Sequence, residues 1–129
     1  MKKLAVVMSV PSTAAALKAM AQIKNKLGQT KRTRVMFTED GKLTFVSGIL
    51  QKSLKDVAQL DKYSKSDVLI VPSYGDESGA LPGLSDIKMY LNNNLGFSIF
   101  VCAVPEDDEA ELASVTDNIV DIVKSNMGI

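Results

Sequence analysis

The stretch SDVLIVPSYGDESGALPG, residues 66–83, decides the fold class, because an apolar run leads directly into a loop of turn-forming residues. From Asp67 to Ser73 the chain carries mostly aliphatic side chains without polar alternation. Such a run is typical of a strand that is buried on both faces of a parallel sheet. The Tyr74-Gly75 pair and the acids that follow it predict a loop at the end of this strand.

A second run of the same kind spans residues 3–10 and is followed by Pro11-Ser12-Thr13. We expect Ser12 to be the N-cap of a helix, with Thr13 as the alternative, because a hydroxyl oxygen accepts an amide hydrogen of the first turn. The helix is expected to end at Gly28. Its apolar residues recur at helical spacing, namely Leu17, Met20, Ile23 or Lys24, and Leu27.

Residues 33–47 predict a β-hairpin that interrupts the alternation of strands and helices. Two β-rich runs, residues 33–38 and 43–47, flank the Asp-Gly turn signal of residues 39–42. After Gly48, apolar residues of one helical face predict a helix that continues to about Tyr63. These residues are Leu50, Leu54, Val57 and Leu60.

The rest of the chain repeats the pattern of a strand followed by a helix. A helix is expected after Leu81-Pro82-Gly83 and up to the Asn-rich residues 92–96. Residues 97–104 predict a further buried strand. The last helix is expected to begin at the acids of residues 106–109, because the positive end of a helix dipole favours carboxylates.

The four successive strand-and-helix units predict one α/β domain over residues 1–129. We expect a three-layer α/β/α sandwich, with a parallel sheet and the hairpin inserted after the first helix. Counted by unit, the strand order common in small doubly wound sheets is 2-1-3-4. Ligands of such sheets bind beyond the carboxyl ends of the strands, at the switch point between strands 1 and 3.

The composition excludes several classes of chemistry. The chain has no histidine and one cysteine, Cys102, so it offers no His-based triad, no internal disulfide and no ordinary zinc site. Its 46% hydrophobic and 23% charged residues are ordinary for a soluble globular protein. No apolar run approaches the roughly 18 residues of a membrane span. We therefore expect a cytoplasmic protein that binds neither a metal nor a membrane.

The net charge of zero conceals a marked separation. Residues 1–65 hold thirteen Lys and Arg against four acids, a net charge of +9, and residues 66–129 hold two lysines against eleven acids, a net charge of −9. In the expected strand order the two halves fall on opposite sides of the sheet. We therefore expect a bipolar molecule that attracts an oppositely charged partner protein or a second copy of itself. With few aromatic residues and no net positive charge, nucleic acid is not an expected partner.

Two loops at the expected switch point carry the candidate binding residues. At the start of the first helix, free amide groups and the hydroxyls of Ser9, Ser12 and Thr13 suit a phosphate, although the same residues also suit simple helix capping. In the loop after residue 73, Tyr74 can stack on an aromatic ring and Gly75 allows close approach of a ligand. Asp76 and Glu77 can accept hydrogen bonds from ligand NH groups. The alternative reading is a flexible surface loop.

Three short motifs resemble the flavodoxin-like family: S-V-P-S-T at residues 9–13, V-P-S-Y-G at residues 71–75, and L-P-x-x-x-x-I-x-x-Y-L-N-N-N at residues 81–94. They are most similar to the small flavodoxins that serve ribonucleotide reductase. The resemblance covers residues 3–104 by topology and only residues 71–94 by recognisable sequence. It implies that Ser9, Ser12 and Thr13 hold the phosphate of FMN. It also implies that Tyr74 and Gly75 lie beside the isoalloxazine ring.

The sequence thus leaves three functions open. The first is binding of FMN, or of a similar phosphorylated ligand, for electron transfer. The second is a cofactor-free interaction or assembly protein that uses its oppositely charged edges. The third is a small nucleotide-processing enzyme that uses Asp76 or Glu77 as a carboxylate nucleophile or base.

Overall fold

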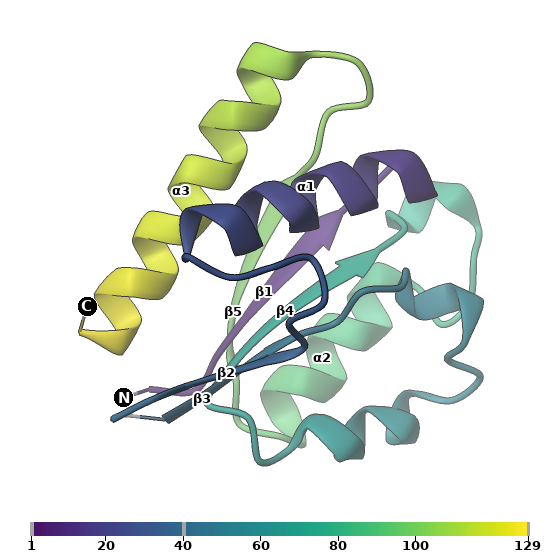
Figure 1. Cartoon of the computed structure of the whole chain (residues 1–129). Helices are drawn as coiled ribbons and strands as arrows, with labels where there is room; N and C mark the ends of the chain where they lie inside the picture. The colour runs from purple at the N-terminus through teal and green to yellow at the C-terminus, as the bar shows by residue number, and fades with distance from the viewer. Residues whose placement is uncertain (1, 40, 129) are drawn as a thin grey trace.

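The computed structural model describes residues 2–39 and 41–128 and shows an α/β fold built on a mixed five-stranded sheet (Figure 1). The strand order is β2-β3-β4-β1-β5, and only the β2–β3 pair is antiparallel. The strands are β1 (Leu4–Ser9), β2 (Val35–Thr38), β3 (Gly41–Phe45), β4 (Val68–Ser73) and β5 (Ser98–Ala103).

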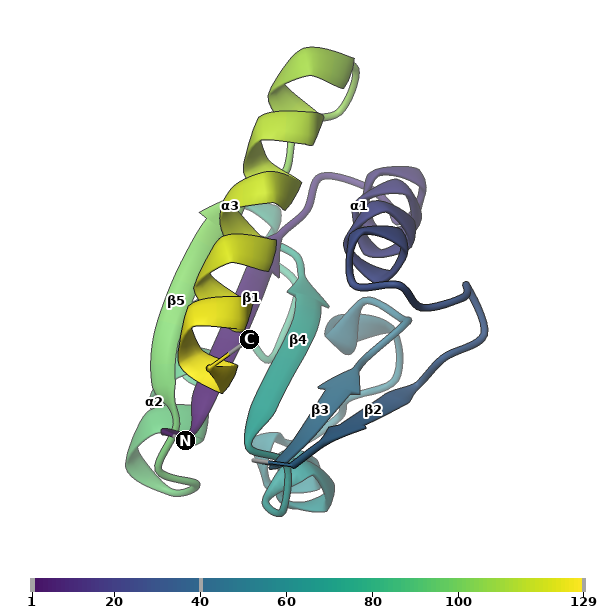
Figure 2. The ribbon, with the colours of Figure 1, turned by 60° about the vertical axis from the view of Figure 1, so that its left-hand side comes forward.

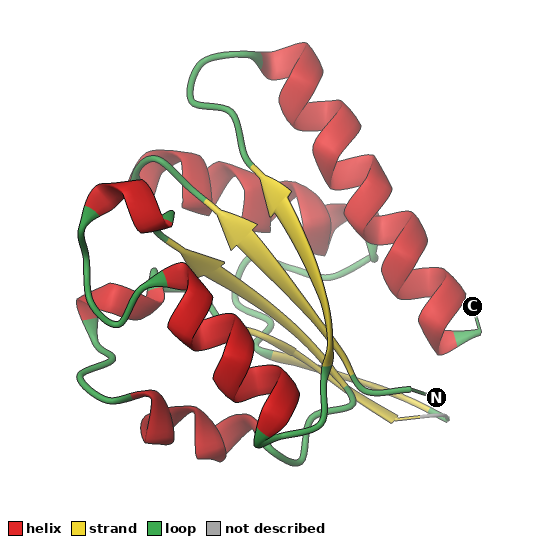
Figure 3. Cartoon of the chain, turned by 180° about the vertical axis from the view of Figure 1, so that it is seen from behind, coloured by secondary structure: helices red, strands yellow, loops and turns green. Residues whose placement is uncertain are grey.

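Helices cover both faces of this sheet, so the expected three layers are present (Figures 2 and 3). One face carries α1 and α3, which pack against each other, and the other carries α2 with two 3₁₀ helices, η1 and η2. The helical elements are α1 (Thr13–Lys26), η1 (Leu50–Lys52), η2 (Val57–Tyr63), η3 (Asp76–Ser78), α2 (Leu84–Asn93) and α3 (Glu109–Met127).

The two apolar runs of the sequence form the centre of the sheet. Every residue of β4 is buried, and so is β1 from Leu4 to Met8. Alternate side chains of each strand enter opposite layers, as Val6 and Ile70 do beneath α1 and α3, and as Val7 and Val71 do beneath α2. The prediction of strands buried on both faces is therefore confirmed for these two.

The expected strand order 2-1-3-4 is wrong. Strand β4 lies between the hairpin and β1, so by unit the order is 2-3-1-4. The hairpin strand β3 continues through the short η1 and η2 segments into β4, its immediate parallel neighbour. Consecutive elements prefer to be adjacent in space, and this compact crossover joins nearest neighbours instead of passing over β1.

The new order also corrects the expected charge separation. Because β4 belongs to the acidic half of the sequence and is inserted between β3 and β1 of the basic half, the two halves alternate across the sheet. Only the outermost strands keep the expected polarity. The hairpin at one edge comes from the basic half, and β5 at the other edge comes from the acidic half.

Two local expectations also need correction. The single helix expected over residues 50–63 is two 3₁₀ segments, because Asp56 starts a new turn: its carboxylate accepts from the amide of Ala58 at 2.9 Å. Strand β5 is an edge strand and only partly buried, with 38% of Val101 exposed. The predicted hairpin is confirmed, although residue 40 of its turn lies outside the described residues. Within residues 2–39 and 41–128, no helix has the length and apolar character needed to cross a membrane.

The strand order can be tested by cross-linking. The hydroxyl oxygens of Thr44 in β3 and Ser66, just before β4, lie 2.6 Å apart. In a Cys102→Ala background, Thr44→Cys with Ser66→Cys is expected to form a disulfide on mild oxidation, measured as loss of free thiols. Thr44→Cys with Ser98→Cys serves as the control and is expected to keep its thiols, because β4 and β1 separate those positions. Equal cross-linking of both pairs would contradict the order.

Candidate functional site

The two predicted binding loops lie side by side at the carboxyl edge of the sheet. Ser9 at the end of β1 is in register with Ser73 at the end of β4, and the amide of Val10 donates to the Ser73 carbonyl at 2.9 Å. From this point β1 continues into α1 on one face, whereas β4 leads to α2 on the other. Adjacent strands whose connections leave on opposite faces create a crevice between their ends.

The start of α1 is arranged as expected for a helix cap, and it already contacts an acid. Ser12 is the N-cap, and its hydroxyl accepts from the amide of Ala15 at 3.1 Å. The same hydroxyl donates to a carboxylate oxygen of Glu106 at 3.0 Å. The ammonium of Lys52 donates to the hydroxyl of Thr13. A carboxylate and an ammonium from distant parts of the chain therefore meet at this helix terminus.

The backbone around Tyr74 is held by one side chain that the sequence did not single out. The side-chain oxygen of Gln51 accepts from the amide of Tyr74 at 3.0 Å. Its nitrogen donates to the hydroxyl of Ser73 at 2.8 Å and to the carbonyl of Pro82 at 3.0 Å. Ser73 is fully buried and donates in turn to the Tyr74 carbonyl at 2.8 Å. Tyr74 is half-buried and packs against the core beneath α1 and α3.

The two predicted acids are both exposed, and Asp76 is held in place by hydrogen bonds. Asp76 accepts from the Ser85 hydroxyl at 2.6 Å and from the Ser85 amide at 3.1 Å, which ties the loop to the first turn of α2. These hydrogen bonds, more than the charge of Lys88, lower the pKa of the Asp76 carboxyl. Glu77 is exposed and folds over Gly75, where a Cβ atom would lie 2.4 Å from its carboxylate oxygens.

The structure thus brings all the predicted residues to one edge but gives most of their polar groups partners within the chain. Ser9 is half-buried, and its carbonyl accepts from the amide of Val104 at 2.9 Å. A hollow of about 500 Å³ lies elsewhere, between η2 and α2, and none of the predicted residues lines it. Among the described residues, no cluster of acidic or sulfur side chains is suited to a metal ion.

Sequence reasoning missed Gln51 and Lys52, because it placed residues 50–63 on a regular helix over the sheet. The sequence could have indicated Gln51 and Lys52 through Ser47-Gly48, which come shortly after β3. Strand β3 runs parallel to β4 and therefore ends at the same edge of the sheet. The loop after such a strand must reach the same carboxyl edge as the loops after β1 and β4.

Cys102 has the properties of a structural residue. It lies half-buried in β5 and contacts the core beneath α3. Burial raises the pKa of its thiol to about 12, so almost none of it is the reactive thiolate at neutral pH.

Comparisons of the chain with models of protein families, with curated proteins and with solved structures gave no significant match.

The contacts of Asp76 predict a change in its titration. Ser85→Ala removes the hydroxyl donor, so the pKa of Asp76 is expected to rise towards its ordinary value. The ionised carboxyl of Asp76 stabilises the fold above its unfolded-state pKa, and this contribution is lost as the pH falls through the folded-state pKa. Because the folded-state pKa is higher in Ser85→Ala, the variant should lose this contribution at a higher pH than the wild type. Carboxyl-carbon NMR measures the titration. Ser98→Ala, which does not contact Asp76, is the control, and an unchanged pKa in Ser85→Ala would contradict the assignment.

Proposed function

We propose that the protein binds a small phosphorylated ligand in the crevice between the ends of β1 and β4. The observation that carries the proposal is that the start of α1 already holds an anion, the carboxylate of Glu106 on Ser12. Amide groups of the first helical turn have no intrahelical acceptor, and the helix dipole favours negative charge at this point. Lys52 adds a cation at Thr13. A phosphate that displaces the exposed Glu106 side chain gains the same contacts.

FMN is the candidate ligand that the resemblance to flavodoxins suggests, and the residues fit it in part. Ser12, Thr13 and Lys52 suit its phosphate, and Tyr74 suits its ring. Glu106 does not fit, since a carboxylate at the phosphate position repels the ligand until it turns away. When bound, FMN supplies electron transfer, and the role of the chain is to hold the phosphate and orient the ring.

The enzymatic alternative has less support. Both carboxylate oxygens of Asp76 accept hydrogen bonds from Ser85, and its lowered pKa makes it a weak base. Glu77 is exposed and folds over Gly75. Their contacts favour roles in shaping the loop over catalysis.

The ligand proposal predicts opposite effects of two charges. Glu106→Gln removes the competing carboxylate and is expected to tighten FMN binding by about tenfold, or ~1.4 kcal/mol. Lys52→Met removes the cation and is expected to weaken binding by a similar factor. Quenching of flavin fluorescence and the shift in melting temperature provide the measurements, with Glu111→Gln and Lys55→Met as matched controls.

Riboflavin, which lacks the phosphate, separates the two ends of the ligand. We expect it to bind at least tenfold more weakly than FMN and to be insensitive to both substitutions. A colourless purified protein whose melting temperature does not change with FMN excludes flavin binding. Equal affinity for FMN and riboflavin would exclude the phosphate contacts proposed for α1.

A second function, assembly with further copies of the same chain, is supported by the two outer edges of the sheet. In the described part of the chain β2 pairs only with β3, and β5 pairs only with β1. Exposed Lys31, Arg32 and Arg34 precede β2, where 76% of Phe37 is exposed. The opposite edge strand, β5, comes from the acidic half of the sequence and leads into α3, whose exposed acids include Asp121. A contact between two different edges leaves one edge free at each end of the assembly, so it favours open chains of subunits.

This assembly is expected to depend on salt, because it pairs exposed charges. Arg32→Glu or Asp121→Lys alone should reduce the apparent mass in gel filtration at low salt, and mixing the two variants should restore a heterodimer through the reversed pair. Lys65→Glu, which changes the charge away from both edges, is the control. A wild-type chain that stays monomeric at all salt and protein concentrations contradicts the assembly.

A further inference from the structure

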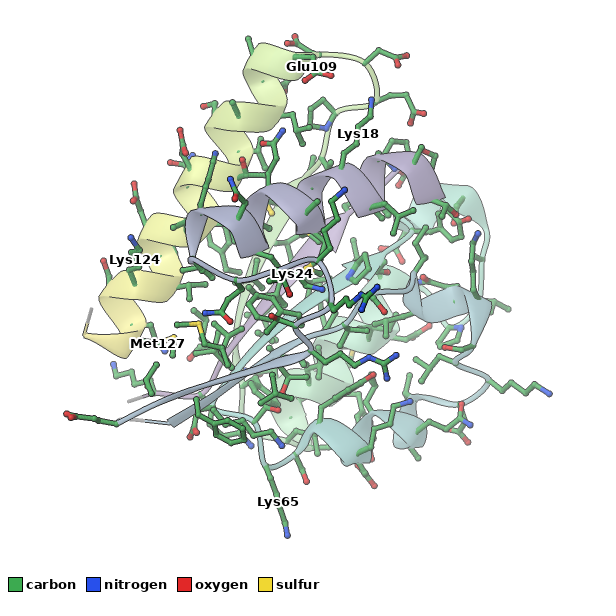
Figure 4. The ribbon with its side chains drawn as sticks, viewed as in Figure 1. Lys18, Lys24, Lys65, Glu109, Lys124 and Met127 are labelled. Carbon is green, nitrogen blue, oxygen red and sulfur yellow. The ribbon has the colours of Figure 1, made fainter. Side chains whose placement is uncertain are left out.

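Lys24 is unusual among the described residues, because it is a charged side chain with only 4% of its surface exposed. It lies in the last turn of α1, on the side that faces the sheet (Figure 4). Its ammonium is 5.5 Å from the centre of the Phe45 ring and donates a hydrogen bond of 3.1 Å to the carbonyl of Lys31. An ammonium has three donors, so this single acceptor leaves most of its capacity unused.

The described residues offer this buried charge no ion-pair partner. Where the chain is described, the two ion pairs involve Lys18 and Lys26, and no carboxylate pairs with Lys24. Burial, and secondarily the charge of Arg34, lowers the pKa of the Lys24 ammonium. Removing an ion from water is costly. The negative end of the α1 dipole offsets part of that cost.

A hollow of about 270 Å³ opens directly beside Lys24. Its polar wall consists of Lys24, Lys31 and Ser47, and its apolar wall consists of Leu17, Met20 and Ala21. No acid lines it. The apolar wall includes Leu17, which lies on the predicted apolar stripe of α1 but is 56% exposed. The hollow therefore combines unneutralised positive charge with uncovered aliphatic surface.

We propose that this hollow is a second anion site, which binds a small phosphate monoester with an aliphatic body. The phosphate contacts the ammonium groups of Lys24 and Lys31 and the hydroxyl of Ser47, and the aliphatic part covers Leu17 and Met20. The site lies along the C-terminal half of α1 and next to the end of β3, so it is distinct from the crevice at the start of α1.

The charge of the site favours a phosphate monoester over a carboxylate. Lys24 and Lys31 supply two positive charges to the hollow, and Arg34 adds to the local potential. A phosphate monoester carries about −1.5 to −2 charges at pH 7, whereas a carboxylate carries one. A neighbouring hollow of about 390 Å³ that also includes Ser47 is lined by Arg34 and Lys62, and by no acid among the described residues. The described surroundings therefore contribute further positive charge.

Butyl phosphate is the probe that tests this site in the full-length chain. We expect saturable binding in calorimetry, with amide shifts in NMR concentrated at residues 17–31 and 47–48. Lys24→Met keeps the length of the side chain and is expected to weaken binding at least tenfold. Because it removes an unpaired buried charge, the same variant should melt at the wild-type temperature or above it. Lys65→Met, which changes an exposed lysine far from the hollow, is the matched control (Figure 4).

Three results would overturn the proposal. They are the absence of wild-type binding, unchanged affinity in Lys24→Met, and shifts confined to residues 9–13, which would assign the probe to the crevice. Should Lys24→Met fail to fold, Lys31→Met at an exposed position provides the same test. Butyrate lacks the phosphate, and inorganic phosphate lacks the aliphatic body. Each is expected to bind at least tenfold more weakly than butyl phosphate. Neither Glu106→Gln nor Lys52→Met should alter the affinity for butyl phosphate at this hollow. A negative result here is therefore distinguishable from a lack of ligand binding in the crevice at the start of α1.

Discussion

The parallel pairing of β1 with β4 is the constraint on which the rest of the molecule depends. Both strands are buried on both faces and have a strand on each side, so their backbone groups must pair within the sheet. A shift by one residue would exchange the side chains of the two layers and expose each to the wrong helices. The register that places Ser9 beside Ser73 therefore also fixes where the loops after these strands meet.

That pairing brings the two loops together at the switch point, but the chain supplies many of the contacts that a ligand would need there. Glu106 binds Ser12, Gln51 binds the backbone at Tyr74, and Ser85 binds Asp76. A ligand that replaces such bonds gains only the difference between the new contacts and the old ones. Glu106 is exposed, negatively charged and bound at the start of α1, so it is the contact that an incoming phosphate exchanges at the lowest cost.

Local patterns in the sequence predicted what depends on local physics. The burial of β1 and β4, the Ser12 cap, the hairpin and the helices α1 and α3 all follow from the spacing and chemistry of neighbouring residues. The strand order was not predictable in this way, since a connection after the hairpin can reach either β1 or β4 with the same local pattern. The spacing also allowed Ile23 or Lys24 on the buried face of α1, and both are buried. The spacing of apolar residues predicts which side chains are buried, but it does not show whether a buried charge is neutralised.

The distribution of charge explains why Lys24 differs from the other lysines of α1. The acids of α3 reach the outer side of α1, where Lys18 meets Glu109 and Lys26 meets Asp117. Lys24 faces the sheet, and the strands beneath it present Phe45 in place of an acid. The net charge of zero therefore conceals a local excess of positive charge that pairs with no carboxylate of the described residues. An anion that neutralises this excess must come from outside the described chain, and the hollow beside Lys24 is where it has access.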